Sequence, residues 1–302
     1  MSDLLAEAVV DDQSIAVRTE GLTKTYGALH AVAGLDLSIP RGSTFGLIGP
    51  NGAGKSTTFA ILASLLTPTA GRAEVAGFDP SIDPVEVRRR VGYMPDVMGV
   101  YDNLRVQEYL EFFAAAYAVP RARWSELIGN LLELVDLTVK RDSMVDSLSR
   151  GMKQRLSLAR ALVHDPEVLI LDEPASGLDP RARVELRELL LELRKMGKTI
   201  IVSSHILAEL EEMCTHVAIL EAGRLLASGS PRDIRSALPT GRRIVVKLAG
   251  GEEQVHVVAD DEEQVALVRR LLVDEGLRVL QVVEADSGLE DLFMRITKGV
   301  VQ

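Results

Sequence analysis

The sequence predicts an α/β fold with a second, smaller α+β domain at its C-terminal end. Apolar strand-type segments alternate with helix-type segments, which is the order of a parallel sheet covered by helices. A glycine-rich run directly follows the first of these strands, and the pattern changes after the turn-rich residues 237–241. The 302 residues suffice for one large domain and one small one.

The parallel sheet is predicted from the middle of the chain. The apolar runs 45–48 and 168–171 and the run 199–203 are expected to be strands. Residues 57–66 and 181–195 have the composition of helices. Because strand and helix alternate, we expect helices on both faces of the sheet.

Two further regions frame this sheet. Residues 15–26 and 35–39 alternate with the period of a strand, which favours a small antiparallel sheet beside the parallel one. Between the first two parallel strands, apolar residues recur at helical spacing. We therefore expect a helical arm over about residues 97–165, with helices at 104–119, 123–135 and 148–163.

The C-terminal residues predict a compact α+β domain of about 60 residues, which is near the lower limit for independent stability. Its expected strands are 243–248, 254–258 and 278–284, and its expected helices are 261–275 and 289–297. The chain should then consist of a loose N-terminal tail at 1–14, a main domain at 15–238 and an accessory domain at 239–302.

Composition narrows the class of protein. A net charge of −10 and a pI near 5.1 argue against binding nucleic acid through a broad basic surface. The single cysteine, Cys214, excludes an intramolecular disulfide and suits a reducing compartment. No apolar run approaches the roughly 18 residues of a membrane-spanning helix, and the first residues lack the pattern of a secretory signal.

Residues 49–57 carry the strongest signal, because they form a complete phosphate-binding loop after an apolar strand. The glycines let backbone N–H groups turn inward around phosphate oxygens, Lys55 can reach the β- and γ-phosphates, and Ser56 can hold Mg²⁺. The positive end of the following helix faces the same anion. We expect a nucleotide and Mg²⁺ to bind here, through Gly49, Pro50, Asn51, Gly52, Ala53, Gly54, Lys55, Ser56 and Thr57.

Two carboxylates follow the buried strand 168–171. Asp172 and Glu173 come where a parallel sheet presents its ligand-binding edge. Asp172 can orient Mg²⁺, directly or through water, and Glu173 can polarise a water for in-line attack on the γ-phosphate. These two residues predict hydrolysis rather than binding alone.

A second anion-binding element is predicted at residues 148–155. Ser149 occupies the capping position of a helix and Gly151 follows two residues later. One nucleotide has one γ-phosphate, so this element suggests a nucleotide held by another copy of the chain. Judged from these residues alone, a plain helix cap explains the pattern equally well.

Five motifs in this order and spacing resemble the nucleotide-binding subunits of ATP-binding cassette (ABC) transporters. The resemblance covers roughly residues 15–235, and it implies a P-loop ATPase with a mixed sheet, an antiparallel β subdomain and a helical subdomain. The motifs are the phosphate loop and residues 148–154, 171–174, 176–179 and 203–205.

The resemblance also implies roles for single residues. It implies that two subunits face head to tail with two ATP molecules between them, each contacted by the phosphate loop of one chain and by Ser149 and Gly151 of the other. Tyr26 matches the aromatic residue that stacks on adenine, His205 the histidine that senses the γ-phosphate, and Asp179 the residue that bridges the two active sites.

Two departures from the family pattern stand out. Asp96 occupies the position where the family usually has a glutamine that senses Mg²⁺ and the attacking water, so a metal role here rests on a shorter, charged side chain. Arg150 and Met152 replace residues of the commonest Ser-Gly-Gly-Gln signature, while Ser149 and Gly151 keep the small or hydroxyl side chains that must approach phosphate.

The resemblance further implies separate transmembrane permease subunits that dock near residues 97–106 and hold the ATPase at the cytoplasmic face of the membrane. We expect the second ATPase subunit to be another copy of this chain. Residues 287–297 are similar to the tail of drug-resistance-type ABC-2 exporters, which points to efflux.

Two other classes of function compete with export. A soluble ABC ATPase that remodels a cytoplasmic complex usually has two cassettes or a long coiled-coil insertion, and this chain has neither. A module that switches on ATP without turnover predicts loss of the base, yet Glu173 is present. The face of the arm near Tyr101 distinguishes an exporter from a soluble remodelling ATPase. A membrane partner needs a groove there rather than a basic patch.

Overall fold

The computed structural model describes residues 14–96, 99, 103–204, 207–237, 242–249, 253–258 and 261–285. The chain divides into two compact units, with the division between Ser228 and Gly229. Tyr101, His205 and the expected helix at 289–297 lie outside the described residues.

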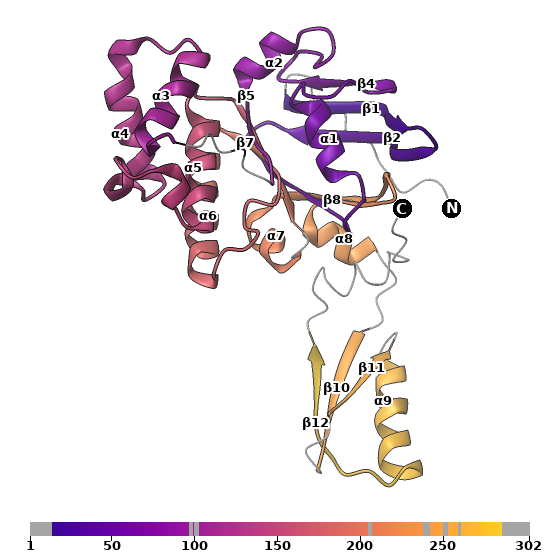
Figure 1. Cartoon of the computed structure of the whole chain (residues 1–302). Helices are drawn as coiled ribbons and strands as arrows, with labels where there is room; N and C mark the ends of the chain where they lie inside the picture. The colour runs from indigo at the N-terminus through magenta and orange to yellow at the C-terminus, as the bar shows by residue number, and fades with distance from the viewer. Residues whose placement is uncertain are drawn as a thin grey trace. The chain divides into compact units, whose positions relative to one another are not determined.

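A six-stranded sheet forms the centre of the first unit (Figure 1). Its neighbouring strands β5 to β6, β6 to β7, β7 to β3 and β3 to β8 run parallel, and every residue of β3, β6 and β7 is buried. Buried parallel strands have continuous apolar runs, so the strands predicted at 45–48, 168–171 and 199–203 are confirmed. In spatial order the strands are β5 Val91–Met94, β6 Val168–Leu171, β7 Thr199–Ser204, β3 Thr44–Ile48, β8 His216–Glu221 and β9 Arg224–Gly229.

The predicted antiparallel sheet is also confirmed. β1 (Ile15–Tyr26) pairs with β2 (Leu29–Pro40) on one side and with β4 (Ala70–Val75) on the other. The sequence pattern did not predict β4, because only Ala73 and Val75 of its six residues are buried and the alternating pattern is short. Side chains of this sheet share one hydrophobic core with the central sheet, so the two sheets form one body.

Helices connect and cover the central strands. α1 (Lys55–Leu62) starts two residues before the predicted helix at 57–66 and ends four residues earlier, where Ser64 takes a positive φ of 59°. The predicted helix at 181–195 is observed as α6 (Pro180–Lys195). The remaining helices of this region are α2 Pro84–Arg90 and α7 Leu207–Met213. After α7, burial raises the pKa of the Cys214 thiol.

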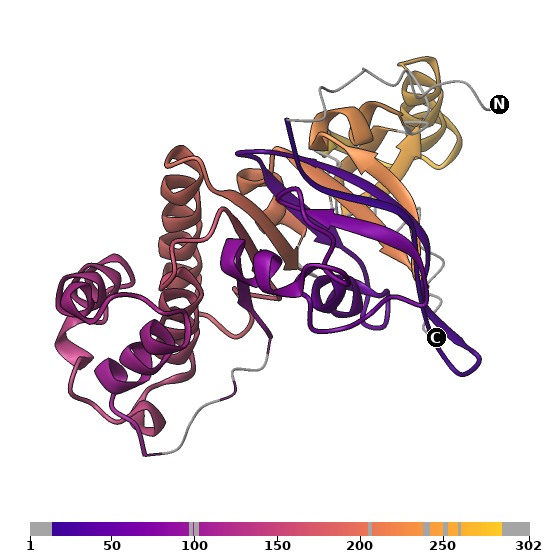
Figure 2. The same cartoon turned by 90° about the horizontal axis from the view of Figure 1, so that it is seen from above.

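The helical arm consists of α3 (Val106–Ala116), α4 (Trp124–Leu134) and α5 (Arg150–Leu162), joined by short 3-10 turns at 121–123, 138–140 and 145–147. These helices gather on one side of the central sheet, away from β1 and β2, in both views (Figures 1 and 2). The arm therefore matches the three helices predicted between 104 and 163.

The C-terminal end of α5 is anchored at His164. Its ring stacks on Tyr117 with centroids 3.7 Å apart and an interplanar angle of 9°, and its Nε2 lies 3.0 Å from the Val91 carbonyl oxygen. Burial lowers the pKa of His164 to about 4. One neutral ring thus ties the end of α5 to the arm and to β5.

The second unit contains α8 (Pro231–Ala237) and a three-stranded antiparallel sheet in the order β11-β10-β12, with bounds Glu253–Val258, Arg242–Leu248 and Val279–Ala285. The predicted helix at 261–275 is observed as α9 (Asp261–Arg269), which continues into a π-helical turn at 270–274. Its core contains Ile244, Val246, Leu248, Leu267 and Leu271. Across both units, the helices that the structure describes are all too short or too polar to cross a membrane.

Candidate nucleotide-binding site

The phosphate loop connects β3 to α1, and its backbone requires glycine. Gly54, which caps α1, has a φ of 102°, and a Cβ atom there would lie 2.3 Å from the Ala31 carbonyl oxygen. L-residues rarely adopt this φ, so a side chain at Gly54 would be strained and would collide with Ala31. No side chain caps the N-terminus of α1. The first N–H groups of the helix are therefore left for a ligand.

A hollow of about 300 Å³ lies in front of this loop. Tyr26, residues 50–57, Asp96, Asp172 and Glu173 all line it, so the structure brings together most of the residues predicted from the sequence. Gly49 does not line the hollow, but its carbonyl oxygen accepts a hydrogen bond from Lys55. Tyr26, at the rim, is half exposed, with the Lys24 ammonium 5.4 Å from its ring centroid. An exposed ring at this place is free to stack on a base.

Lys55 supplies the positive charge of the hollow. Its Nζ donates hydrogen bonds to the carbonyl oxygens of Gly49 (2.7 Å) and Pro50 (3.3 Å) and lies 3.8 Å from Oε1 of Glu173. Burial lowers the pKa of Lys55, while the carboxylates of Glu173 and Asp172 oppose that shift. The side chain is only 7% exposed, so its charge acts in a site of low dielectric constant.

The two predicted carboxylates are held by a third residue, Ser203. Its Oγ donates to Oδ1 of Asp172 (2.6 Å) and accepts from the backbone N–H of Glu173 (2.8 Å). Glu173 has a φ of 49°, which is uncommon for a residue other than glycine. One hydroxyl group thus fixes both the carboxylate that ends β6 and the strained backbone of the next residue.

The role of Ser203 was not predicted, although its signal is present in the strand register. Leu171 of β6 lies opposite Val202 of β7 in a parallel pair, so the next residues along the two strands, Asp172 and Ser203, become neighbours. Both strands were predicted, but their pairing was not. The hydrogen bond could only be expected once the pairing was known.

The oxygen atoms around the hollow suit Mg²⁺. Ser56, Asp96 and Asp172 line the same space, and hydroxyl and carboxylate oxygens are the ligands that hard cations prefer. No group of three or more His, Cys, Asp or Glu residues that could hold a metal occurs among the described residues. Mg²⁺ commonly binds through one or two carboxylates together with substrate phosphates, which agrees with such a sparse set.

The second predicted anion site lies apart from the first. Ser149 caps α5, and its Oγ accepts from the backbone N–H of Met152 at 3.3 Å. Ser149, Gly151 and Asp179 line a separate hollow of about 410 Å³, which contains no phosphate-loop residue. Within one chain, the structure therefore does not bring these three residues to the phosphate loop.

The N-terminal end of α5 is bound to the loop that carries Asp179. Arg150 donates to Oγ of Ser176 and Gln154 donates to the Ser176 carbonyl oxygen, each at 3.2 Å. Gly177 has a φ of 71°, and a Cβ there would approach the Arg150 guanidinium to 2.7 Å. Asp179 caps α6 by accepting from Ala182 N–H at 2.9 Å. In the sequence, Arg150 is only a departure from the Ser-Gly-Gly-Gln signature. In the structure, its guanidinium has a hydrogen-bond partner, Ser176.

The fold and this site define a P-loop nucleotide-binding protein with a helical arm. The family model described as ABC transporter matches residues 32–176. The chain is 35% identical to a Nod factor export ATP-binding protein I of Ralstonia nicotianae, over 92% of each chain. It is also 35% identical to a daunorubicin resistance ATP-binding protein of Streptomyces coeruleorubidus, over 93% of this chain and 95% of that one. The chain therefore belongs to the ATP-binding subunits of ABC transporters and is an ATPase of that family.

Solved structures agree with this assignment. One described as an ATP-binding subunit of an ABC transporter is 33% identical, with a TM-score of 0.68 over 74% of this chain and 92% of that one. Another, 25% identical with a TM-score of 0.66 over 71% and 98% of the two chains, is a dimeric ATP-binding cassette in a post-hydrolysis state with ADP and phosphate.

Proposed function

We propose that this chain is the ATP-hydrolysing subunit of an ABC-2 type exporter, which binds MgATP between two head-to-tail copies and drives efflux through separate membrane subunits. The proposal rests on one observation: the predicted site residues lie in two separate hollows of the same chain. Lys55, Asp172 and Glu173 line the hollow in front of the phosphate loop, whereas Ser149 and Asp179 line another hollow of the same chain. A second copy is needed to join the two halves, and the dimeric cassette supports this arrangement.

The proposed direction of transport is export, and it is supported by the names of the relatives. Their names state Nod factor export and daunorubicin resistance, and the similarity extends over more than nine tenths of this chain. It therefore includes most of residues 239–302, which we propose as an accessory domain. The transported molecule is a property of the membrane subunits, which we expect to contact the arm near residues 97–106 at the cytoplasmic face of the membrane.

The geometry supports hydrolysis by the following steps. The loop N–H groups and Lys55 hold the β- and γ-phosphates, and Tyr26 stacks on the base. Glu173 orients a water for in-line attack on the γ-phosphorus and accepts its proton, while the bond from the γ-phosphorus to the β–γ bridging oxygen breaks and ADP leaves. Lys55 and His205 stabilise the charge on the transferred group, His205 being assigned from the resemblance alone. Ser56, Asp172 and Asp96 would hold Mg²⁺, which would supply positive charge to the phosphate oxygens.

The experiment that tests this proposal is purification of Glu173→Gln with ATP from detergent-solubilised membranes of its own cell. The variant keeps the phosphate loop and loses the carboxylate that orients water, so we expect it to bind ATP without turnover and to remain in the closed dimer. Mass spectrometry then identifies its partners, with Lys55→Ala prepared in the same way as the control that does not close.

A polytopic membrane protein recovered in matching amount with Glu173→Gln is the expected result. Recovery of soluble partners alone would favour a cytoplasmic remodelling ATPase instead. Hydrolysis by Glu173→Gln at the wild-type rate would show that the base is assigned wrongly.

A further inference from the structure

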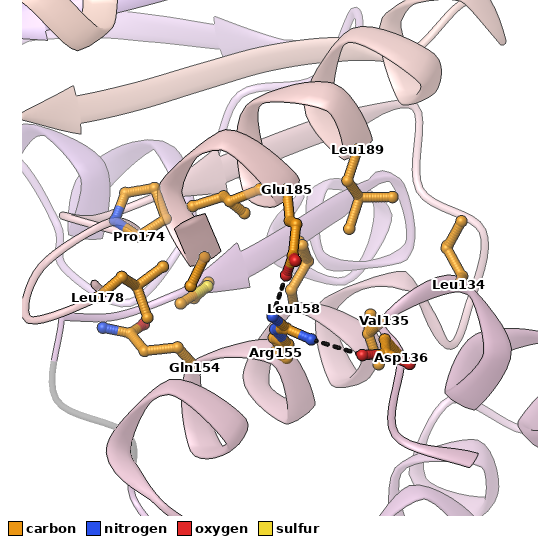
Figure 3. A pocket seen from close by; sticks show the side chains of 13 residues that line it. Leu134, Val135, Asp136, Gln154, Arg155, Leu158, Pro174, Leu178, Glu185 and Leu189 are labelled. Atoms are coloured by element: carbon orange, nitrogen blue, oxygen red, sulfur yellow. Dashed lines mark hydrogen bonds and ion pairs between the residues drawn. The ribbon is translucent and has the colours of Figure 1, made fainter. Parts of the chain in front are cut away.

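An apolar cavity of about 230 Å³ lies between the helical arm and the central body (Figure 3). α4 supplies Leu134, α5 supplies Leu158 and α6 supplies Leu189. Pro174 and Leu178 line the side towards the nucleotide site. Three separate parts of the fold thus contribute apolar side chains to one space outside the nucleotide-binding hollow.

The charged groups at the rim of this cavity neutralise one another. Arg155 Nη1 lies 3.1 Å from Oδ2 of Asp136, and the same guanidinium pairs with Glu185 (Figure 3). Glu185 pairs in addition with Arg181, at 3.0 Å. These two cations and two carboxylates sum to no net charge. A charged ligand would lose its hydration without gaining a partner, so the rim selects uncharged molecules.

The cavity also offers one polar group that can recognise a ligand. Gln154 lines it, and its Nε2 donates to the carbonyl oxygen of Ser176. Its amide oxygen can accept one hydrogen bond. The volume is below the 300–1,000 Å³ or so of sites for drug-sized molecules, so the occupant has about one or two rings.

The cavity adjoins both halves of the nucleotide machinery. Pro174 directly follows Glu173, and Leu178 directly precedes Asp179. Asp136, Arg155 and Glu185 also line the hollow that contains Ser149, so the ion pairs form a wall between the two spaces. An occupant would touch the arm and the central body at once, together with the loop between Glu173 and Asp179.

We propose that this cavity binds an uncharged aromatic molecule of one or two rings with a single hydrogen-bond donor, and that the occupant holds the arm against the central body and slows ATP turnover. The part of the proposal that concerns binding of this molecule depends only on the cavity and its lining residues. The effect on turnover rests on the proposed function.

The first test measures binding to the full-length chain without nucleotide. The probe is 2-naphthol, and the readout is the ¹³C-methyl NMR signal of Met94, which lines the cavity and is assigned with Met94→Leu. We expect a saturable shift below about 1 mM, as the size of the probe allows. Naphthalene-2-carboxylate has the same rings with a charge and should bind at least about tenfold more weakly.

Matched variants locate the site. Leu134→Trp fills the cavity from a position that is 40% exposed and should abolish the shift, whereas Leu226→Trp, equally exposed on β9 and outside the cavity, should leave it unchanged. Ala182→Leu fills the cavity from α6 and serves as the second blocking variant. The absence of a saturable shift, or a shift that persists in both blocking variants, would overturn the proposal.

The second test measures turnover. Saturating 2-naphthol should lower ATP hydrolysis severalfold in the wild type and in Leu226→Trp, with no effect on Leu134→Trp. Unchanged turnover at saturation would overturn the claim that the occupant holds the arm. A wild-type chain that hydrolyses no ATP would count against the proposed function, while the Met94 signal would still test the site.

Discussion

The two helix N-termini that we propose as phosphate sites differ in their local structure. At α1, the cap is Gly54 in a left-handed conformation, the next residue is a buried lysine, and no side chain uses the N–H groups. At α5, Ser149 is exposed and its hydroxyl already accepts one of the helix N–H groups. The first end is preorganised around a ligand of its own chain. At the second end, a side chain of the helix itself already accepts one N–H group, which agrees with our proposal that this end meets a phosphate only in a dimer.

The largest effect should come from two variants, one that disables the N-terminal end of α1 and one that disables the N-terminal end of α5. Lys55→Ala removes the charge in the phosphate loop, and Gly151→Asp puts a carboxylate beside Ser149, so each homodimer should lose about 10³-fold or more in turnover. Mixing the two variants should restore hydrolysis, because a mixed dimer contains one intact pair of ends. ATP hydrolysis after co-refolding or co-expression measures this.

The control for this experiment places both changes in one chain. The double variant mixed with Lys55→Ala should restore nothing, since every phosphate loop is then defective. Failure of the two single variants to complement each other would mean that the ends do not act across a dimer.

Ser203→Ala should have the next largest effect. It leaves Oδ1 of Asp172 and the N–H of Glu173 without the hydroxyl that joins them, which costs about 1–3 kcal/mol of stability. We expect turnover to fall about 10- to 100-fold while ATP binding changes little. Ser157→Ala is the matched control, because the Ser157 hydroxyl is equally buried and has no hydrogen-bond partner in the structure. Equal turnover in the two variants would contradict the positioning role of Ser203.

Arg150→Ala tests how firmly the α5 end is held. The change removes the hydrogen bond to Oγ of Ser176 and the packing over Gly177, so the hydrogen bond from Gln154 holds the helix end to the loop of Asp179 less firmly. We expect a severalfold lower kcat with an unchanged ATP affinity of the isolated chain. Arg150→Lys should not rescue, because a lysine cannot place a planar guanidinium over the glycine. A kcat equal to that of the wild type would show that this contact has no role in the cycle.

The smallest effect concerns the other end of α5 and appears in stability. The pKa of His164 is about 4 in the folded chain against 6.5 ordinarily, so between these values the unfolded chain binds a proton that the folded chain does not. Stability should therefore decrease as pH falls from 6.5 to 4, and this contribution should level off below. Burial is the largest cause of the lowered pKa and Lys198 adds to it, and together they outweigh the hydrogen bond to Val91 and the charge of Asp165, which both raise the pKa. His164→Gln should show a flatter dependence of Tm on pH, and identical slopes would refute the assignment.

Sequence patterns predicted the local features of this site and missed the features that depend on pairing. The loop at 49–57 and the acidic strand end at 172–173 are contiguous motifs, so their chemistry could be predicted before the fold was known. The bridge made by Ser203 and the contact between Arg150 and Gly177 require the strand register and the packing of α5. β4 was not predicted for a related reason, because it is defined by its pairing with β1 more than by its composition.

The contact between Lys55 and Glu173 has a consequence for the timing of the reaction. Lys55 Nζ lies 3.8 Å from Oε1 of Glu173, so the carboxylate that we propose as the base is paired with the ammonium group that we propose for the phosphates. In the hydrolysis that we propose, phosphate oxygens compete with Glu173 for this ammonium group, so substrate binding weakens the pairing between the two side chains. On this proposal the order of events, substrate binding first and orientation of the water by Glu173 second, depends on one pair of side chains.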